Sequence, residues 1–230
     1  MKNKLIIISS VIIIIGVLIS LLFFVSYNNV QTKYTKDEIK FKEEYESVNG
    51  LELAEDYILK TLDIKSDNNI VYVDDNEILD LLKEGTNVIY LGWNKCNWCR
   101  SVVPTLLEVM SDNEIDKIYY YDFKELRTAY ENDTDEKSVK LYENIIEIIG
   151  EDITSVFAET SNRAGEKKVL APTVIFVKDG SYEGLHAVSV SSQEKATDEL
   201  TKVQKNELYD IYQKLVNKIK PNVCIEDEGC

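Results

Sequence analysis

The stretch VIYLGWNKCNWCRSVVPTLLEVM, from Val88 to Met110, decides the fold of this chain. Residues 88–91 are β-branched, aromatic or apolar, which is typical of a buried strand, and Gly92 ends the run. From Cys99 onward the spacing changes, because the apolar positions 99, 102, 103, 106 and 110 fall on one face of a helix. The sequence therefore predicts that the Cys-x-x-Cys of Cys96 and Cys99 lies where a buried strand passes into a helix.

This placement makes the first cysteine a candidate nucleophile. The attacking species in disulfide exchange is the thiolate, and a helix N-terminus stabilises an anion through its unpaired N–H groups and partial positive charge. We expect Cys96 to be exposed and ionised there, with Lys95 and Arg100 adding positive potential. Cys99 points to the apolar face one turn further on, and it would resolve the mixed disulfide that Cys96 forms with a partner.

Two other interpretations of the pair stay open. Half of a zinc site needs a second pair of ligands, and the other candidates are Cys224, Cys230 and the single histidine, His186. Alternatively, both thiols are inert core residues. A strand–helix junction is the context that favours redox chemistry. We therefore interpret Cys96 and Cys99 as a redox-active pair that uses no metal and no organic cofactor.

The surroundings of this motif resemble the thioredoxin superfamily. The resemblance is carried by Trp93, Cys96, Cys99, Arg100 and Pro104, and by Ala171-Pro172-Thr173 ahead of the strand Val174 to Val177. It covers residues 68 to 220. The resemblance implies an α/β, thioredoxin-like fold with a mixed central sheet flanked by helices. It also implies that Cys96, at a helix start, faces a cis Pro172.

The resemblance further implies a substrate-binding surface. The backbone around Ala171, Pro172 and Thr173 would hold an extended substrate strand. Trp93 and Trp98 would form an apolar rim, and simple packing is the alternative for both tryptophans. The motif Cys-Asn-Trp-Cys-Arg, with the Pro-Thr strand and a membrane anchor, is also similar to the bacteriocin transport accessory proteins.

Two positions depart from thioredoxin. Thioredoxin has Gly-Pro between its cysteines, where this chain has Asn97-Trp98. Thioredoxin also has a buried aspartate six residues before the first cysteine, where this chain has Tyr90. These differences leave the reduction potential, and hence the direction of electron flow, open.

The uncharged run from Leu5 to Val25 predicts a transmembrane helix. A helix of that length spans about 30 Å, the thickness of a bilayer core. A cleaved signal peptide is the alternative, but the run is longer than a signal h-region and residues 26–29 offer no small-residue cleavage site. Lys2 and Lys4 place the short N-terminal side in the cytoplasm. We expect a single-pass protein of the cell membrane with its catalytic domain extracytoplasmic, where disulfides persist.

Length and charge limit the remaining possibilities. The chain has 230 residues and a net charge of −15, which argues against nucleic acid or an anionic membrane surface as the main partner. We expect four regions: a transmembrane anchor at 1–26, a tether and N-terminal extension at 27–67, a thioredoxin-like domain at 68–221 and an acidic tail with cysteines at 222–230.

Apolar periodicity also predicts the order of elements. Strands are expected at 70–73, 88–91, 118–123, 174–177 and 185–190, and Asp179-Gly180 marks a hairpin between the last two. Helices are expected at 77–84, from Cys99 onward, around 142–149 and at 208–219. We interpret 125–136 as a polar loop, 150–168 as a decoration or lid, and 41–64 as short helices or loosely ordered chain. His186 is interpreted as a partly buried strand residue rather than an acid–base catalyst.

The tail Cys224-Ile-Glu-Asp-Glu-Gly-Cys230 brings two cysteines close together. In an oxidising compartment they most simply form a local disulfide, and the carboxylates between them oppose thiolate formation. A relay with the Cys96 pair, or a bond to a partner, is the alternative. We expect a structural disulfide between Cys224 and Cys230.

The function that the sequence predicts is membrane-anchored thiol–disulfide exchange on extracytoplasmic proteins or peptides. It needs a redox partner that recharges the Cys96–Cys99 pair. The alternative, from a different class, is a non-enzymatic, membrane-tethered binding or accessory module for peptide export, in which the thiols are incidental.

Overall fold

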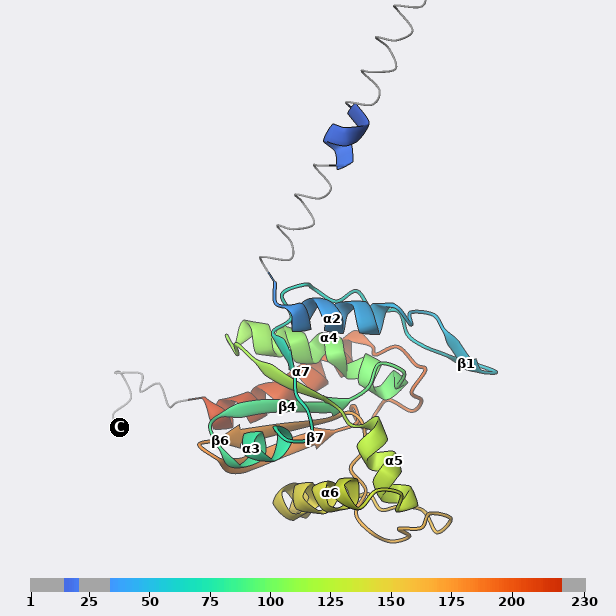
Figure 1. The fold of residues 1–230 in the computed structure, drawn as a ribbon, viewed down its shortest axis with the longest axis vertical. Helices are drawn as coiled ribbons and strands as arrows, with labels where there is room; N and C mark the ends of the chain where they lie inside the picture. The colour runs from blue at the N-terminus through green and yellow to red at the C-terminus, as the bar shows by residue number, and fades with distance from the viewer. Residues whose placement is uncertain (1–14, 21–33, 221–230) are drawn as a thin grey trace, which may run out of the picture.

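A five-stranded mixed sheet forms the centre of the protein (Figure 1). The computed structural model describes residues 15–20 and 34–220. The strands lie in the order β3 (Ile70–Tyr72), β5 (Ile118–Asp122), β4 (Asn87–Gly92), β6 (Thr173–Lys178) and β7 (Ser181–Ala187). β3, β5 and β4 are parallel, β6 is antiparallel to β4, and β7 is antiparallel to β6. This confirms the predicted α/β class with a mixed sheet.

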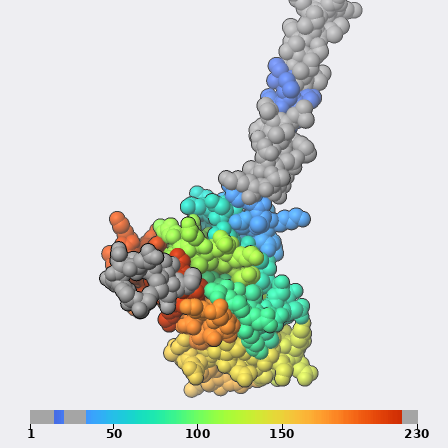
Figure 2. All heavy atoms as spheres, turned by 90° about the vertical axis from the view of Figure 1, so that its left-hand side faces the viewer, coloured from blue at the N-terminus to red at the C-terminus, as the bar shows by residue number. Residues whose placement is uncertain are grey.

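Helices cover both faces of the sheet. One face carries α2 (Lys36–Glu46), α4 (Asn97–Asp112) and α7 (Lys202–Ile219), and the other carries α3 (Ile78–Lys83), α5 (Lys124–Asn132) and α6 (Glu136–Ile149). Figure 1 shows α2 and α4 above the sheet and α6 below it. Figure 2 shows the same stacking from the side, with blue α2 near the top and the yellow chain around residue 150 at the bottom.

β4 is the central strand around which these layers form. All six of its residues are buried. Val88 and Tyr90 join the core on the α4 side, whereas Ile89 and Leu91 join the core on the α6 side. Successive side chains of a strand point to opposite faces, so a strand covered on both faces is apolar without alternation. That is why the unbroken apolar run predicts β4 correctly.

One predicted loop is a helix. The polar segment 125–136 is expected to be irregular, but α5 occupies Lys124–Asn132 and α6 begins at Glu136. α5 buries only Leu126 and Tyr130. These two side chains make a single turn of contact, which is too short a pattern to distinguish a helix from a loop.

The second strand of the predicted hairpin is shifted. The pattern places it at 185–190, whereas β7 begins directly after the turn at Ser181 and ends at Ala187. Val188 has a φ of 65°, in the left-handed region that a β-branched residue rarely adopts. This residue interrupts the extended chain, so Val190, although buried, lies beyond the strand.

The segment 150–168 contributes to the core below the sheet. It starts with a single 3-10 turn, η1 (Gly150–Asp152), and Val156 pairs with Lys167 as an isolated bridge. Ile153 and Phe157 are buried in the same cluster as α5 and α6. The rest of the segment is a turn-rich excursion closed by backbone hydrogen bonds between 155–157 and 165–168.

The N-terminal extension packs into the folded core. α2 buries Phe41 and Tyr45 completely, and both rings contact Tyr120 of β5. The extension continues as a short hairpin of β1 (Glu52–Ala54) and β2 (Tyr57–Ile58). Of the two alternatives for 41–64, the structure thus shows ordered chain, with a helix that starts at residue 36.

Arg100 ties this extension to α4. Its side chain is 1% exposed. The guanidinium donates hydrogen bonds to the carbonyl oxygens of Lys60 at 2.6 Å, Tyr45 at 2.8 Å and Asn94 at 3.0 Å. It also donates to Oδ1 of Asn49. The buried charge is therefore satisfied by oxygen dipoles, three from the extension and one from Asn94.

Within the two described ranges, no helix is both long and apolar enough to cross a membrane. The predicted transmembrane segment at 5–25 falls largely outside those ranges, and residues 15–20 within it are helical. The predicted Cys224–Cys230 disulfide also lies outside the described residues.

The buried guanidinium leads to a stability prediction. Arg100→Met leaves the buried carbonyl oxygens of Tyr45 and Lys60 without this donor, so we expect the free energy of unfolding to fall by about 2–4 kcal/mol. Urea denaturation followed by tryptophan fluorescence measures the change. Lys140→Met on the exposed face of α6 is the control, expected within about 0.5 kcal/mol of the parent. If both variants unfold at the same urea concentration, Arg100 does not have this role.

Candidate active site

Cys96 and Cys99 lie where β4 passes into α4. Cys96 is the N-cap residue of α4, with an extended backbone of φ −105° and ψ 112°. Its sulfur accepts a hydrogen bond from the backbone N–H of Cys99 at 3.3 Å. The Cys96 sulfur thus caps the N-terminus of α4, a task that serine or aspartate oxygens usually perform. The predicted strand–helix junction is confirmed.

The pKa of the Cys96 thiol is lowered from its ordinary value. The largest cause is a hydrogen bond with the Cys99 side chain. The backbone N–H groups of Cys99 and Trp98 and the positive charge of Arg127 act in the same direction, while burial opposes them. The lowered pKa increases the thiolate fraction at neutral pH, and the thiolate is the nucleophile.

The expectation that Cys96 is exposed is wrong. The residue is only 7% exposed, because the chain before β6 packs over it. The Cys96 thiol donates to the carbonyl oxygen of Ala171, with sulfur and oxygen 3.5 Å apart. Cys96 nevertheless lines a surface pocket, so the sulfur is approached through that pocket.

Cys99 has the opposite character. It is completely buried in the core between β4, α4 and α7. Burial, together with the neighbouring Cys96, raises the pKa of Cys99 well above its ordinary value. Cys99 therefore stays protonated while Cys96 ionises. This asymmetry matches the roles of an attacking thiol and a resolving thiol.

Arg127 of α5 is the cation that acts on Cys96. Its guanidinium carbon lies 4.5 Å from the centroid of the Trp93 ring, and both residues line the pocket of Cys96. Arg100, which the sequence proposes for this task, is instead buried among the carbonyl groups of the N-terminal extension. The sequence does not single out Arg127, because no spacing signal connects it with the Cys-x-x-Cys and because segment 125–136 is interpreted as a loop rather than as α5.

The segment opposite the cysteines has a cis peptide bond between Ala171 and Pro172, as the resemblance implies. The carbonyl oxygen of Pro172 accepts from the backbone N–H of Val188 at 2.7 Å. Thr173 begins β6 and is fully buried, and its hydroxyl donates to the carbonyl oxygen of Leu170 at 2.7 Å. Of the three residues predicted here for substrate binding, Ala171 lines the pocket, whereas Pro172 and Thr173 do not.

The pocket beside Cys96 has a volume of about 420 Å³. It brings together the predicted residues Trp93, Trp98 and Ala171. The remaining lining residues, which the sequence does not mark as substrate-binding, are Tyr57, Lys95, Arg127, Lys168, Leu170 and Val188. They come from β2, the turn before α4, α5, and the two loops that flank β6 and β7. Such a wall is assembled by tertiary structure alone.

Asn97, between the cysteines, holds the β1–β2 hairpin beside the pocket. Its side-chain amide donates to the carbonyl oxygen of Ile58 at 2.8 Å, and its oxygen accepts from the backbone N–H of Lys60 at 2.9 Å. Asn97 itself is fully buried. The position where thioredoxin has glycine thus carries the contact that positions Tyr57 at the pocket.

Tyr90 lies beneath Cys99, at the position where the resemblance expects a buried aspartate. Its hydroxyl is 2.9 Å from the hydroxyl of Tyr45, and both side chains are fully buried. Burial raises the pKa of Tyr90 well above its ordinary value, so the group is a hydrogen-bond donor rather than a base. A hydrogen bond from Tyr90 lowers the pKa of Cys99. A Cβ on Gly92 would come within 2.5 Å of the Tyr90 hydroxyl, so the glycine leaves room for it.

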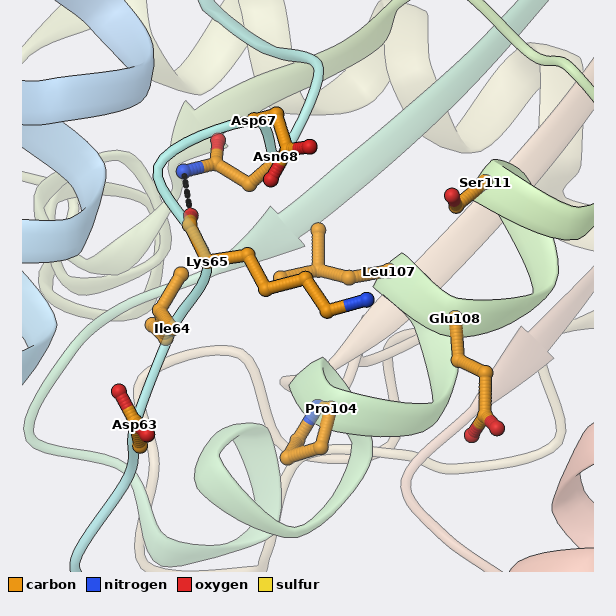
Figure 3. A pocket seen from close by; sticks show the side chains of 9 residues that line it. All are labelled: Asp63, Ile64, Lys65, Asp67, Asn68, Pro104, Leu107, Glu108 and Ser111. Carbon is orange, nitrogen blue, oxygen red and sulfur yellow. Dashed lines mark hydrogen bonds between the residues drawn. The ribbon is translucent and has the colours of Figure 1, made fainter. Parts of the chain in front are cut away.

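A second pocket lies between residues 63–68 and the later turns of α4 (Figure 3). Its volume is about 280 Å³. Figure 3 shows Pro104 and Leu107 of α4 facing the loop, and the Asn68 amide donating to the carbonyl oxygen of Lys65 at 2.9 Å. Neither cysteine lines this pocket, so we place the thiol chemistry in the first one.

His186 is a half-buried residue of β7, as interpreted from the sequence. Its ring meets the ring of Tyr212 edge-on, with centroids 5.6 Å apart. Burial lowers the pKa of His186. Among the residues that the structure describes, no group of three or more His, Cys, Asp or Glu side chains is arranged to hold a metal ion.

The sequence matches no protein-family model and no curated protein. Among solved structures, the chain is similar to thioredoxin O1 from Arabidopsis thaliana in its oxidized state, at 16% identity and a TM-score of 0.35, covering 64% of this chain and 98% of that one. It is also similar to thioredoxin from Aeropyrum pernix, at 16% identity and a TM-score of 0.33, covering 65% of this chain and 86% of that one. Both of these structures are thioredoxins.

The hydrogen bond between the cysteines predicts how the reactivity of Cys96 depends on pH. Cys99→Ala removes the largest cause of the lowered pKa, so the midpoint of Cys96 alkylation should move to higher pH and the rate at neutral pH should fall. Arg127→Gln should move it in the same direction by a smaller amount. The measurement is the iodoacetamide rate against pH, read by mass spectrometry of the peptide that contains Cys96.

Arg163→Gln is the matched control, because its guanidinium pairs with Asp133 at 2.6 Å and does not line the pocket. Its midpoint should equal that of the parent protein. A Cys99→Ala protein with the parental midpoint would show that the second cysteine does not activate the first.

Proposed function

We propose that this chain is a thiol–disulfide oxidoreductase in which Cys96 attacks a disulfide of a protein or peptide and Cys99 resolves the mixed disulfide. The observation that carries the proposal is the opposite perturbation of two neighbouring thiols. The pKa of Cys96, at the wall of a pocket, is lowered, and that of Cys99, one turn behind it, is raised. Disulfide exchange needs an ionised first thiol and a second thiol held in reserve.

The reaction in the reducing direction has two steps. The Cys96 thiolate attacks one sulfur of the client disulfide, so a bond from Cys96 to the client forms, the client disulfide breaks, and the leaving sulfur takes up a proton. Cys99 then loses its proton and attacks the Cys96 sulfur. The Cys96–Cys99 disulfide forms and the second client thiol is released. The client gains two electrons and the pair loses them, and oxidation of a client is the reverse.

Two neighbouring groups support these steps. The Ala171 carbonyl, which accepts the Cys96 hydrogen bond in the free protein, lies on the segment that would pair with an extended client chain. The Tyr90 hydroxyl, which lowers the pKa of Cys99, would stabilise the Cys99 thiolate that forms in the second step. A reduced protein partner then reduces the Cys96–Cys99 disulfide, and in the oxidising direction an oxidised partner restores it.

We propose further that the chain is anchored in the cell membrane and acts outside the cytoplasm. This proposal rests on the uncharged run from Leu5 to Val25 and on Lys2 and Lys4 before it. The resemblance to bacteriocin transport accessory proteins adds disulfide-containing exported peptides as a class of client.

Insulin reduction with dithiothreitol tests the chemistry. Cys96→Ser should abolish activity, and Cys99→Ser should stall as a mixed disulfide with the insulin chain that survives non-reducing electrophoresis. The double variant Cys224→Ser, Cys230→Ser is the control and should keep its activity. If the parent protein is inactive in every redox buffer, the non-enzymatic module for peptide export is the better interpretation.

A membrane-impermeant maleimide tests the location. Applied to intact cells after an impermeant reductant, it should label Cys96 in the Cys224→Ser, Cys230→Ser background and leave the additional variant Cys96→Ser unlabelled. Labelling of Cys96 only after the cells are permeabilised would place the domain in the cytoplasm and contradict the proposed orientation.

A further inference from the structure

We propose that the pocket beside Cys96 selects disulfides flanked by acidic residues of a separate client molecule. This inference rests on the oxidoreductase function proposed above and names its substrate class. It comes from the charge of the pocket wall and from the lack of carboxylate partners for that charge among the residues that the structure describes.

The wall of the pocket is cationic in an acidic protein. Lys95, Arg127 and Lys168 line it, and no aspartate or glutamate of the described part of the chain does. The whole chain carries 41 acidic and only 26 basic residues, so a wall with three cations and no anion departs from the general surface. The three side chains come from the turn before α4, from α5 and from the loop before β6. Their convergence is a product of the fold.

These three cations form no salt bridge with a carboxylate of residues 15–20 or 34–220. The salt bridges among the described residues involve Lys42, Lys124 and Arg163, and none involves Lys95, Arg127 or Lys168. Arg127 lies over the Trp93 ring at 4.5 Å, and the Lys168 ammonium lies 5.0 Å from the centroid of Phe157. Aromatic faces therefore hold the two charges without neutralising them.

The Cys96 thiolate does not account for all three cations. Arg127 is the cation among the principal causes that lower the pKa of Cys96. Lys95 and Lys168 face the same space without being among them. A client that brings its disulfide to Cys96 must place its flanking residues between these side chains, where carboxylates are attracted and lysines repelled.

The chain's own tail has this chemistry, because three acidic residues separate Cys224 from Cys230. The tail leaves the fold after α7, at a point too far from Cys96 for Cys224 to reach it. Asn113, at the far end of α4 from Cys96, hydrogen-bonds Gln213 of α7 at 2.7 Å, and α7 continues to Ile219. α4, with 16 residues, is about 24 Å long, whereas the four residues from Lys220 to Cys224 span at most about 14 Å. Cys224 therefore does not reach Cys96. The occupant we assign, on the charge of the pocket wall, is an acidic segment of a second molecule.

Single-turnover kinetics with two cyclic disulfide peptides test the proposal. The acidic probe is Cys-Ile-Glu-Asp-Glu-Gly-Cys, and the matched neutral probe is Cys-Ile-Gln-Asn-Gln-Gly-Cys. The full chain with Cys224→Ser and Cys230→Ser is reduced beforehand, so no recharging partner is needed. We expect the acidic peptide to react about ten-fold faster at low ionic strength, and the ratio to shrink as salt is added.

Variants separate selectivity from chemistry. Lys168→Gln should lower the ratio of the two rates, and Lys168→Glu should lower it further, because it leaves two cations and one carboxylate on the wall. Lys140→Gln, on the exposed face of α6, is the control and should keep the parental ratio. Equal rates for the acidic and neutral peptides would overturn the proposed selectivity and leave the oxidoreductase function intact. If no peptide is reduced, the function itself is overturned.

Discussion

The hydrogen bond from the Cys99 backbone N–H to the Cys96 sulfur is the interaction on which the site depends. It makes a thiol the N-cap of α4, and this places the sulfur at the positive end of the helix while the next cysteine turns into the core. The same peptide unit thus starts the helix, stabilises an anion and separates the environments of the two thiols. β4, buried on both faces, fixes the position of this junction at the end of the central strand.

The sequence predicts that Arg100 adds positive potential near Cys96, but in the structure Arg127 does so and Arg100 stabilises the fold. Arg100 is adjacent to the motif but points into the N-terminal extension, where it satisfies the carbonyl groups of Tyr45 and Lys60. It also donates to the carbonyl oxygen of Asn94, just before α4. Arg127 is remote in sequence but lies over Trp93 beside Cys96. The direction of a long side chain is set by the helix face on which its Cα lies, rather than by the residues next to it in the sequence. Arg100 follows the inward face of α4, so its charge serves stability. The cation that lowers the pKa of Cys96 comes from α5.

Elements with a long apolar pattern could be predicted from the sequence, and those with a short one could not. β4, β5 and β6 are unbroken apolar runs, and α6 and α7 repeat their apolar positions over several turns, so all five are found close to their predicted places. α5 buries only Leu126 and Tyr130, and a single turn carries no period. β7 ends at Ala187 because Val188 adopts a positive φ, a backbone choice imposed by the hydrogen bond from Val188 to Pro172 and invisible in the apolar pattern.

The sequence by itself determined the α/β class, the central strand, the junction that carries Cys96 and Cys99, and the division of the pair into an outer and an inner thiol. These follow from local rules, since strand alternation, helix periodicity and the polarity of a helix end act within a few residues. Only the tertiary structure decided how far Cys96 is buried under Ala171, which cation lies beside it, and which residues form the pocket. Those features join segments as distant as Tyr57, Arg127 and Lys168, and no local pattern encodes the packing of side chains from separate elements.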